Sequence, residues 1–296
     1  MVFVIALDPA SVSAAAAGGE MGCDHLIGVF EALLQNCLIA EFSGTWRMGE
    51  ELKEAVQAIP NYDIRMRCGK FLKVMATRNR FVEAILGHEE DFETQVGLLL
   101  SRHTADPALD AILCETPTSK GTVELFSILA FNRSNFARER SRKASAIVYA
   151  PGEICAQELC SVAFGRLLSH ADNVDLVDSV VGRDFGGNFH EAAGHWCRFF
   201  RSLDRDLSVT LHTEENRAAG VERHFQSLLE DSRVRFRVRG YNAKDLPHDR
   251  FLRTRMFTLD IGRGLDLFDR EGRVRDVRIG LSDHGQFAKL WPRCCS

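Results

Sequence analysis

Apolar residues occur along the chain in short runs, and the spacing within each run predicts a strand or a helix. Residues 2–7 are continuously apolar, which predicts a buried first strand. Helical spacing over 24–35 predicts a helix, and the short apolar run 37–40 predicts a second buried strand. Apart from one valine, residues 11–19 are Ala, Ser and Gly, so we expect a loop there.

Helical spacing dominates the rest of the N-terminal half. We expect helices over 46–59, 65–86, 91–102 and 106–114. The second is basic and amphipathic, which suits either an RNA backbone or a simple exposed helix. The fourth is expected to pack through Leu109, Ile112 and Leu113. A charged run, 133–143, then precedes an apolar strand, and the shift in composition predicts a domain boundary between 143 and 144.

Strands and helices alternate through the second half. We expect strands over 146–149, 174–181, 208–211, 233–240, part of 251–261, and 274–279. Helices are expected over 155–169, 189–203 and 221–230. This alternation predicts an α/β fold, so the chain divides into two α/β domains, 1–143 and 144–296.

Composition supports this division into two domains and excludes some classes of function. A chain of 296 residues with 45% hydrophobic and 26% charged residues suits two globular domains. The net charge of −4 excludes a uniformly basic nucleic-acid binder but not a local basic patch. No apolar run reaches about 18 residues, which disfavours a membrane partner. The nine cysteines form no Cys-x-x-Cys pair and no secretory signal precedes them, so we expect a cytoplasmic protein.

The strongest charge pattern lies in the expected strand 233–240. Arg233, Arg235, Arg237 and Arg239 alternate with Val234, Phe236 and Val238, so the arginines share one face of the strand. One interpretation is a phosphate-binding surface, because arginine presents a fork of donors that matches phosphate. The other is a solvated outer face, paired with carboxylates such as Glu214, Glu215 or Glu230.

A second polar cluster follows. It joins His248, Asp249 and Arg250 to the segment 262–266, with a strand between them. The glycines Gly262 and Gly264 permit close backbone approach. His248 is a candidate nucleophile or acid–base group, held by a carboxylate such as Asp266. The alternative is a structural cluster in which Asp249 or Asp266 pairs with an arginine.

The order His-Asp-Arg, strand, Gly-Arg-Gly-Leu-Asp resembles the phospholipase-D-like C-terminal domain of MIT-domain proteins, over roughly 145–290. The resemblance implies a phospholipase-D-like α/β fold and a homodimer formed through this domain. Active enzymes of that superfamily carry His-x-Lys and a nearby acid, where this chain has Arg250 and Arg255. The resemblance therefore favours binding: Arg250 and Arg263 contact phosphate, and Asp249, Gly262, Gly264 and Asp266 orient them.

A second resemblance lies in the N-terminal half. The strand ending at Asp8, the segment containing Glu41, and Asp106 before an apolar segment resemble bacterial PIN-like ribonuclease domains. It implies a three-layer α/β domain whose carboxylates hold Mg²⁺ or Mn²⁺, with Asp8 and Asp106 as metal ligands and Glu41 as a further catalytic acid. The fourth acid is either Glu115 or Glu124. The ordinary alternative is that Asp8 ends a strand and Asp106 caps a helix.

Together these features predict a nucleic-acid-directed protein. Our expectation is a metal-dependent PIN-like nuclease targeted by a phosphate-binding C-terminal domain, working with a partner in a bacterial antiviral defence or toxin system. The alternative is a non-catalytic scaffold that recognises phosphate, nucleic acid or anionic lipid. The sequence does not choose between RNA and DNA.

Overall fold

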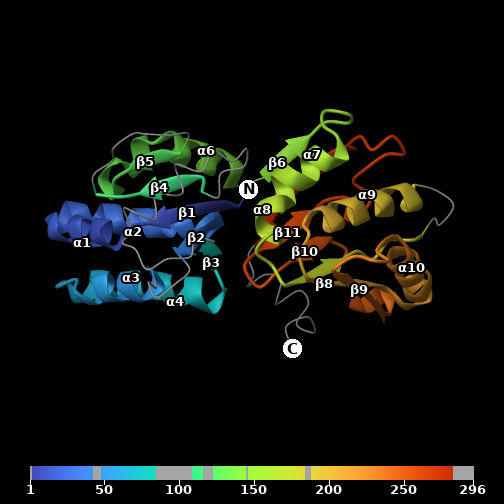
Figure 1. Ribbon diagram of the computed structural model, residues 1–296, viewed down its shortest axis with the longest axis horizontal. Helices are drawn as coiled ribbons and strands as arrows, with labels where there is room; N and C mark the ends of the chain where they lie inside the picture. Colours follow the sequence, from blue (N-terminus) through green and yellow to red (C-terminus); the bar gives the residue numbers. More distant parts are fainter. Residues whose placement is uncertain are drawn as a thin grey trace. The chain divides into compact units, whose positions relative to one another are not determined.

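A computed structural model describes residues 2–42, 48–84, 109–115, 123–144, 146–183 and 188–282. The chain divides into two compact units, Val2–Ala144 and Ser145–Ser296, one residue from the expected boundary. Each unit is built around its own sheet (Figure 1). Helices and strands alternate in both units, and the predicted α/β class is confirmed.

The N-terminal unit contains a parallel five-stranded sheet in the order β3-β2-β1-β4-β5. Its strands are β1 (Phe3–Leu7), β2 (Cys37–Phe42), β3 (Phe81–Ala84), β4 (Ala111–Leu113) and β5 (Glu124–Phe126). β1 is central: Ile5 pairs in register with Ile39 of β2 and with Ala111 of β4. All five residues of β1 are buried, as in parallel sheets that are covered on both faces.

Helices pack against this sheet and against one another. They are α1 (Pro9–Ala17), α2 (Gly19–Asn36), α3 (Met48–Gln57), α4 (Tyr62–Thr77), the 3-10 helix η1 (Ile128–Arg133) and α6 (Asn135–Ala144). The ring of Phe30 in α2 stacks on Phe71 in α4, with centroids 4.1 Å apart. Phe3 of β1 meets the edge of Phe136 in α6 at 5.4 Å. These contacts help to bury apolar side chains of α2, α4 and α6.

The expected loop over 11–19 is wrong, because α1 occupies most of it. The Asp8 side chain accepts a hydrogen bond from the Ala10 N–H at 2.9 Å and so caps the helix, with Pro9 in its first turn. Alanine has the highest intrinsic helix propensity, which explains why a run of small residues forms a helix here. Small side chains alone therefore do not indicate a loop.

Two further expectations for this unit are also wrong. The expected helix over 106–114 contains the strand β4 in its described part, residues 109–114. The expected helix over 65–86 ends at Thr77, because the chain turns through Asn79 at a φ of 51° and then forms β3. A short buried strand lacks the alternation that would separate it from a buried helix. The expected helix 91–102 lies outside the described residues.

The C-terminal unit contains a mixed seven-stranded sheet in the order β6-β12-β11-β10-β7-β8-β9. Its strands are β6 (Ala146–Tyr149), β7 (Asn173–Val177), β8 (Leu207–Glu214), β9 (Val234–Tyr241), β10 (Phe251–Arg253), β11 (Thr258–Ile261) and β12 (Val277–Ser282). The pairs β7–β8 and β8–β9 are parallel, and the other pairs are antiparallel. The range 251–261, expected to contain a strand, contains two, β10 and β11.

The helices of this unit are α7 (Ala156–Cys160), the π-helix η2 (Ser161–Gly165), α8 (Arg166–Leu168), α9 (Phe189–Ser202), α10 (Glu215–Leu228) and the 3-10 helix η3 (Ala243–Asp245). Phe225 of α10 stacks on Phe236 of β9, with ring centroids 4.3 Å apart. Trp196 of α9 is fully buried among Phe164, Phe200 and Phe268. Among the described residues, no helix combines the length and the apolar composition needed to cross a membrane.

Candidate functional site

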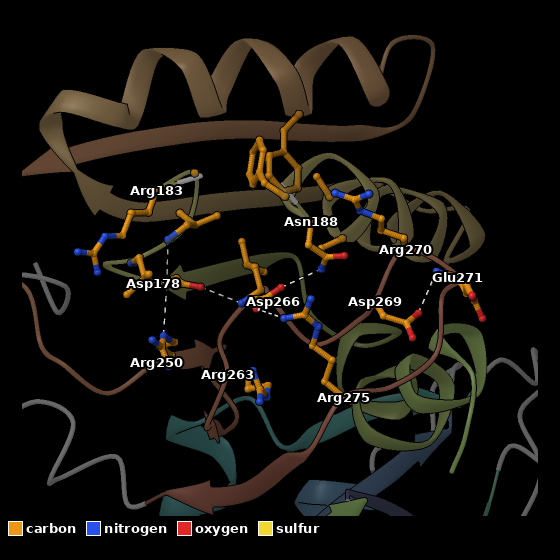
Figure 2. Close-up of a pocket in the computed structure, with 18 residues that line it drawn as sticks. Asp178, Arg183, Asn188, Arg250, Arg263, Asp266, Asp269, Arg270, Glu271 and Arg275 are labelled. Atoms are coloured by element: carbon orange, nitrogen blue, oxygen red, sulfur yellow. Dashed lines mark hydrogen bonds and ion pairs between the residues drawn. The ribbon is translucent and has the colours of Figure 1, made fainter. Parts of the chain in front are cut away.

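The C-terminal unit contains a pocket of about 730 Å³ (Figure 2). Its wall combines the residues that follow β7, the first turn of α9, and the segment 263–275. The charged side chains of the wall are Arg183, Arg250, Arg263, Arg270, Arg275, Asp178, Asp266, Asp269 and Glu271. Residues distant in sequence are therefore brought together by the sheet and by α9.

Asp178, which follows β7 directly, organises one side of the pocket. Its side chain is 3% exposed and accepts hydrogen bonds from the backbone N–H groups of Leu265 (2.8 Å), Val180 (2.9 Å) and Val181 (3.2 Å). The Nε atom of Arg250 lies 3.5 Å from Asp178 Oδ1. Burial raises the pKa of the Asp178 carboxyl, while the backbone donors and Arg250 act in the opposite direction. Asp178 thus ties the chain after β7 to the segment 262–266.

Gly264 makes this close approach possible. Its φ is +63°, a conformation that residues with a side chain rarely adopt. A Cβ atom at this position would lie 2.1 Å from Asp178 Oδ2 and 2.4 Å from Arg250 Cδ. The Gly-Arg-Gly-Leu-Asp segment therefore needs glycine at its third residue for both conformation and space.

Asp266 fixes the opposite side of the pocket. It accepts hydrogen bonds from Asn188 Nδ2 at 2.9 Å and from an Arg275 guanidinium nitrogen at 2.8 Å. Asn188 also donates to the carbonyl of Phe268. Asp266 thus holds Arg275 in place, and its oxygens are occupied by Arg275 and Asn188.

The remaining cations of the wall give the pocket its electrostatic character. Arg183 and Arg270 form no ion pair within the part of the chain that the structure describes. Arg263 donates from Nε to the carbonyl of Asp276 at 2.6 Å, which leaves its terminal nitrogens for another acceptor. Five arginines face four carboxylates, and one of these, Glu271, is paired with Arg273 outside the wall. The positive end of α9 adds to the excess of positive potential.

The structure separates the residues of the predicted His-Asp-Arg cluster. Arg250 lines the pocket and donates to the Gly262 carbonyl at 2.7 Å. His248 and Asp249 are exposed and do not line it. Among the described residues, no hydrogen bond joins His248 to Asp266, so the expected support of His248 by that carboxylate is wrong. The chain bends at His248 and Asp249 just before β10, and only Arg250 of the three reaches the pocket wall.

The alternating arginines lie elsewhere in the unit. In β9, Val234 and Phe236 are buried, and Arg235, Arg237 and Arg239 are exposed, so the predicted alternation is confirmed. Phe236 packs on α10, which places these arginines on the opposite face of the sheet from the pocket wall that includes Phe225.

The carboxylates expected to neutralise this arginine face do not do so. Glu214 pairs instead with Arg217 at 3.1 Å. Among the described residues, the one arginine of the four with an ion-paired carboxylate is Arg233, just before the strand, which pairs with Asp206 at 3.2 Å. No ion pair joins Glu215 or Glu230 to these arginines among the described residues.

Sequence reasoning missed Asp178, Arg183, Asn188, Arg270 and Arg275. A polar residue directly after an apolar strand, with a glycine four residues later, was the available signal for Asp178, because strand ends often carry functional side chains. Nothing local distinguishes Arg270 or Arg275 from other surface arginines. Their roles depend on the fold of the segment 263–275.

In the N-terminal unit, the parallel sheet places several predicted acids at one edge. Asp8 follows β1, Glu41 lies at the end of β2, and Glu115 follows β4. Glu124 begins β5 at the opposite edge and accepts hydrogen bonds from the backbone of Asn135 and Phe136 at 2.9 and 2.7 Å. Of the two candidates for the fourth acid, only Glu115 is therefore in place.

Asp106 lies outside the described residues. Within the described ranges, no group of three or more His, Cys, Asp or Glu side chains is close enough to hold a metal ion. The residues present therefore do not by themselves make up the expected Mg²⁺ or Mn²⁺ site.

Three of the six basic side chains in the segment 65–80 are engaged within its own unit. Arg65 donates to the Ile59 carbonyl at 2.8 Å, and Arg67 pairs with Glu31 at 2.6 Å. Arg80 is buried, donates to the Leu34 carbonyl, and has its pKa lowered to about 9 by burial. These bonds favour the exposed-helix interpretation over an RNA-binding one.

No protein-family model matches the chain, and no curated protein is significantly similar to it.

Proposed function

We propose that the C-terminal unit binds a phosphate-bearing ligand in the pocket around Asp178 and Asp266. The observation that carries this proposal is the pair Arg183 and Arg270, two guanidinium groups on the pocket wall that have no carboxylate partner among the described residues. Like-charged arginines gathered in a concave site are favourable when an anion joins them. Phosphate suits the forked donors of arginine and the positive end of α9.

The wall supports recognition rather than chemistry. The described residues that line it include no histidine, cysteine, serine or lysine. Asp178 and Asp266 are committed to holding Arg250, Arg275 and Asn188. His248, the predicted nucleophile, is exposed and outside the wall. A binding site with pre-positioned arginines is the simplest use of this arrangement.

The expected ligand is of nucleotide size. A volume of about 730 Å³ falls within the range of roughly 300–1,000 Å³ that is typical of small-molecule sites. Phe189, which is half-buried and packs with its ring centroid 6.2 Å from that of the fully buried Phe225, gives the wall an apolar part that suits a base. The arginines would hold the phosphate.

Calorimetric titration with adenosine 5′-monophosphate, and separately with inorganic phosphate, tests the proposal. We expect Arg270→Gln to weaken binding about tenfold or more, since a charge-assisted hydrogen bond contributes about 1.5–3 kcal/mol. Arg223→Gln, on the exposed side of α10, is the matched control and should bind like the wild type. Failure of the wild-type protein to bind either probe, or equal affinity of the two variants, contradicts the proposal.

A second candidate function, metal-dependent nuclease activity, concerns the N-terminal unit. It is favoured by the strand order, which places β1 between β2 and β4 and gathers Asp8, Glu41 and Glu115 at one edge. In open parallel sheets, ligands bind at the carboxyl ends of the strands where the strand order reverses, here at β1 and β4. The described acids at this edge do not form a metal site by themselves, so this candidate requires Asp106 as a further ligand. A Mg²⁺ or Mn²⁺ ion held there would activate water for attack on a phosphodiester.

Cleavage of labelled RNA and DNA in Mn²⁺ tests this candidate. Asp8→Asn and Asp106→Asn should each lower the cleavage rate by at least two orders of magnitude, because a metal ligand would be lost. Glu54→Gln, an exposed change on α3, controls for the loss of one negative charge. Cleavage that persists in both aspartate variants would rule out this site.

A further inference from the structure

One face of β9 presents four side chains in a line. Arg235, Arg237, Arg239 and Tyr241 occupy alternate positions and therefore point to the same side of the sheet. The three arginines are exposed and Tyr241 is half-buried. Alternate residues of a strand repeat at roughly 6.5–7 Å, so the row is an evenly spaced series of three cations ending in an aromatic ring.

Among the described residues, none of the three arginines forms an ion pair, although Asp206, the partner of Arg233, also acts electrostatically on Arg235. Their neighbours in register on β8 are Ser208, Thr210 and His212, none of them acidic. β9 is the last strand of the sheet, so one side of the row is not flanked by another described strand.

Tyr241 is held rigidly at the end of the row. Its hydroxyl lies 3.1 Å from Nδ1 of His212, and His212 Nε2 lies 2.8 Å from Asp175 Oδ1. With Nε2–H donating to the carboxylate, Nδ1 of a neutral His212 accepts from the tyrosine hydroxyl. His212 is 1% exposed, and the ring of Tyr241 packs on the cluster Val177, Leu246 and Phe251. The ring is therefore fixed before any ligand arrives.

We propose that this row binds single-stranded nucleic acid, with backbone phosphates on Arg235, Arg237 and Arg239 and an unpaired base stacked on Tyr241. Proteins that bind single strands combine a basic track with aromatic rings on which bases stack. A duplex would not offer a free base to the ring. An anionic membrane is disfavoured, since the neighbouring apolar side chains Leu246 and Phe251 are buried and offer nothing to insert into lipid.

This site is distinct from the phosphate pocket, which lies on the helix side of the sheet. Arg233 provides an internal control, because it belongs to the same row but is neutralised by Asp206. Because the two sites lie on opposite faces of the sheet, a variant can lose oligonucleotide binding at the row and keep nucleotide binding in the pocket, or the reverse.

The experiment is fluorescence anisotropy of labelled 20-nucleotide poly(U) and poly(dT) with the full chain, in EDTA so that the strands stay intact. The combined change Arg235→Gln, Arg237→Gln and Arg239→Gln should weaken binding at least tenfold. It should also reduce the slope of log K against log salt concentration by about 2, because each phosphate that an arginine neutralises on a single strand contributes about 0.7 to that slope. Arg233→Gln should have less than a twofold effect.

Tyr241 is tested by two variants. Tyr241→Phe keeps the ring and should bind within about threefold of the wild type, while Tyr241→Leu should bind on the order of tenfold more weakly. Far-ultraviolet circular dichroism confirms that both variants fold.

Several results would overturn the proposal. They are absence of oligonucleotide binding by the wild type, equal affinity of the triple arginine variant, or flotation of the wild type with phosphatidylglycerol vesicles without oligonucleotide binding. Aggregation of the triple variant with unchanged affinity would show instead that the arginines only protect an exposed sheet edge.

Discussion

Gly264 adopts a left-handed backbone conformation directly against Asp178 and Arg250. At the residue scale, this one position sets the geometry of the pocket wall, because the chain can approach Asp178 closely only where there is no Cβ atom. Leu265 then donates its N–H to Asp178, and Asp266 is placed to hold Arg275.

Gly264→Ala should destabilise the C-terminal unit by about 2–5 kcal/mol. The left-handed conformation costs a residue with a side chain roughly 1–2 kcal/mol, and forcing an extra carbon into a filled site costs about 1–3 kcal/mol. Urea unfolding measures the change. Gly194→Ala, inside α9 and free of a tight contact, is the control and should be neutral or stabilising. A destabilisation below about 1 kcal/mol at Gly264 would contradict this view of the wall.

Some residues of the pocket could be predicted from the neighbouring sequence alone, and others could not. Gly264, Arg250, Arg263 and Asp266 were found from the sequence because they belong to two short segments, separated by one strand, that are unusual in composition. Their tertiary partner Asp178 was missed, since it lies more than 70 residues earlier in the chain and resembles any polar residue after a strand. His248 was selected for its chemistry, but solvent exposure is not encoded in residue type.

At the scale of elements, long amphipathic or alternating segments were predicted well. The helices α2, α9 and α10 and the strand β9 have a periodicity that matches their burial. Short elements were not predicted well. β4 is a strand of three buried residues, and α1 consists mainly of alanine and serine. Neither therefore shows the alternation of apolar and polar residues that identifies a strand or a helix.

The connection that follows α8 carries a pH-dependent contribution to stability. His170 lies near Arg166 and Arg205, and burial together with these two charges lowers its pKa to about 4. The unfolded chain takes up a proton at His170 below about pH 6.5, whereas the folded chain does not until about pH 4. The contribution of His170 to stability is therefore present above about pH 6.5 and is lost as the pH falls towards 4.

His170→Gln should reduce the acid sensitivity of the protein. Between about pH 7 and pH 5, the wild type should lose about 1–2 kcal/mol more in free energy of unfolding than the variant does. Urea unfolding of both proteins at the two pH values measures the difference. An equal loss in the two proteins would show that His170 does not titrate in this way.

At the scale of the whole molecule, each unit has its own sheet and its own candidate site. The N-terminal sheet is fully parallel and gathers acids at its carboxyl edge, while the C-terminal sheet has a pocket on one side and a row of arginines on the other. Two further predictions concern binding to other chains: a homodimer formed through the C-terminal unit and a partner protein from a defence system. Light scattering of the purified chain, and co-purification with the products of neighbouring genes, test them.

The sequence by itself determined the α/β class, the division near residue 144 and the alternation of arginines with apolar residues in β9. These properties follow from local periodicity and composition, which act over a few neighbouring positions. Only the tertiary structure decided that Arg250 lines a pocket while His248 does not, that Arg233 is neutralised, and that Asp178 supports the segment 262–266. Each of these depends on which distant strands pair and on which side of a sheet a side chain emerges, and no short stretch of sequence specifies such contacts.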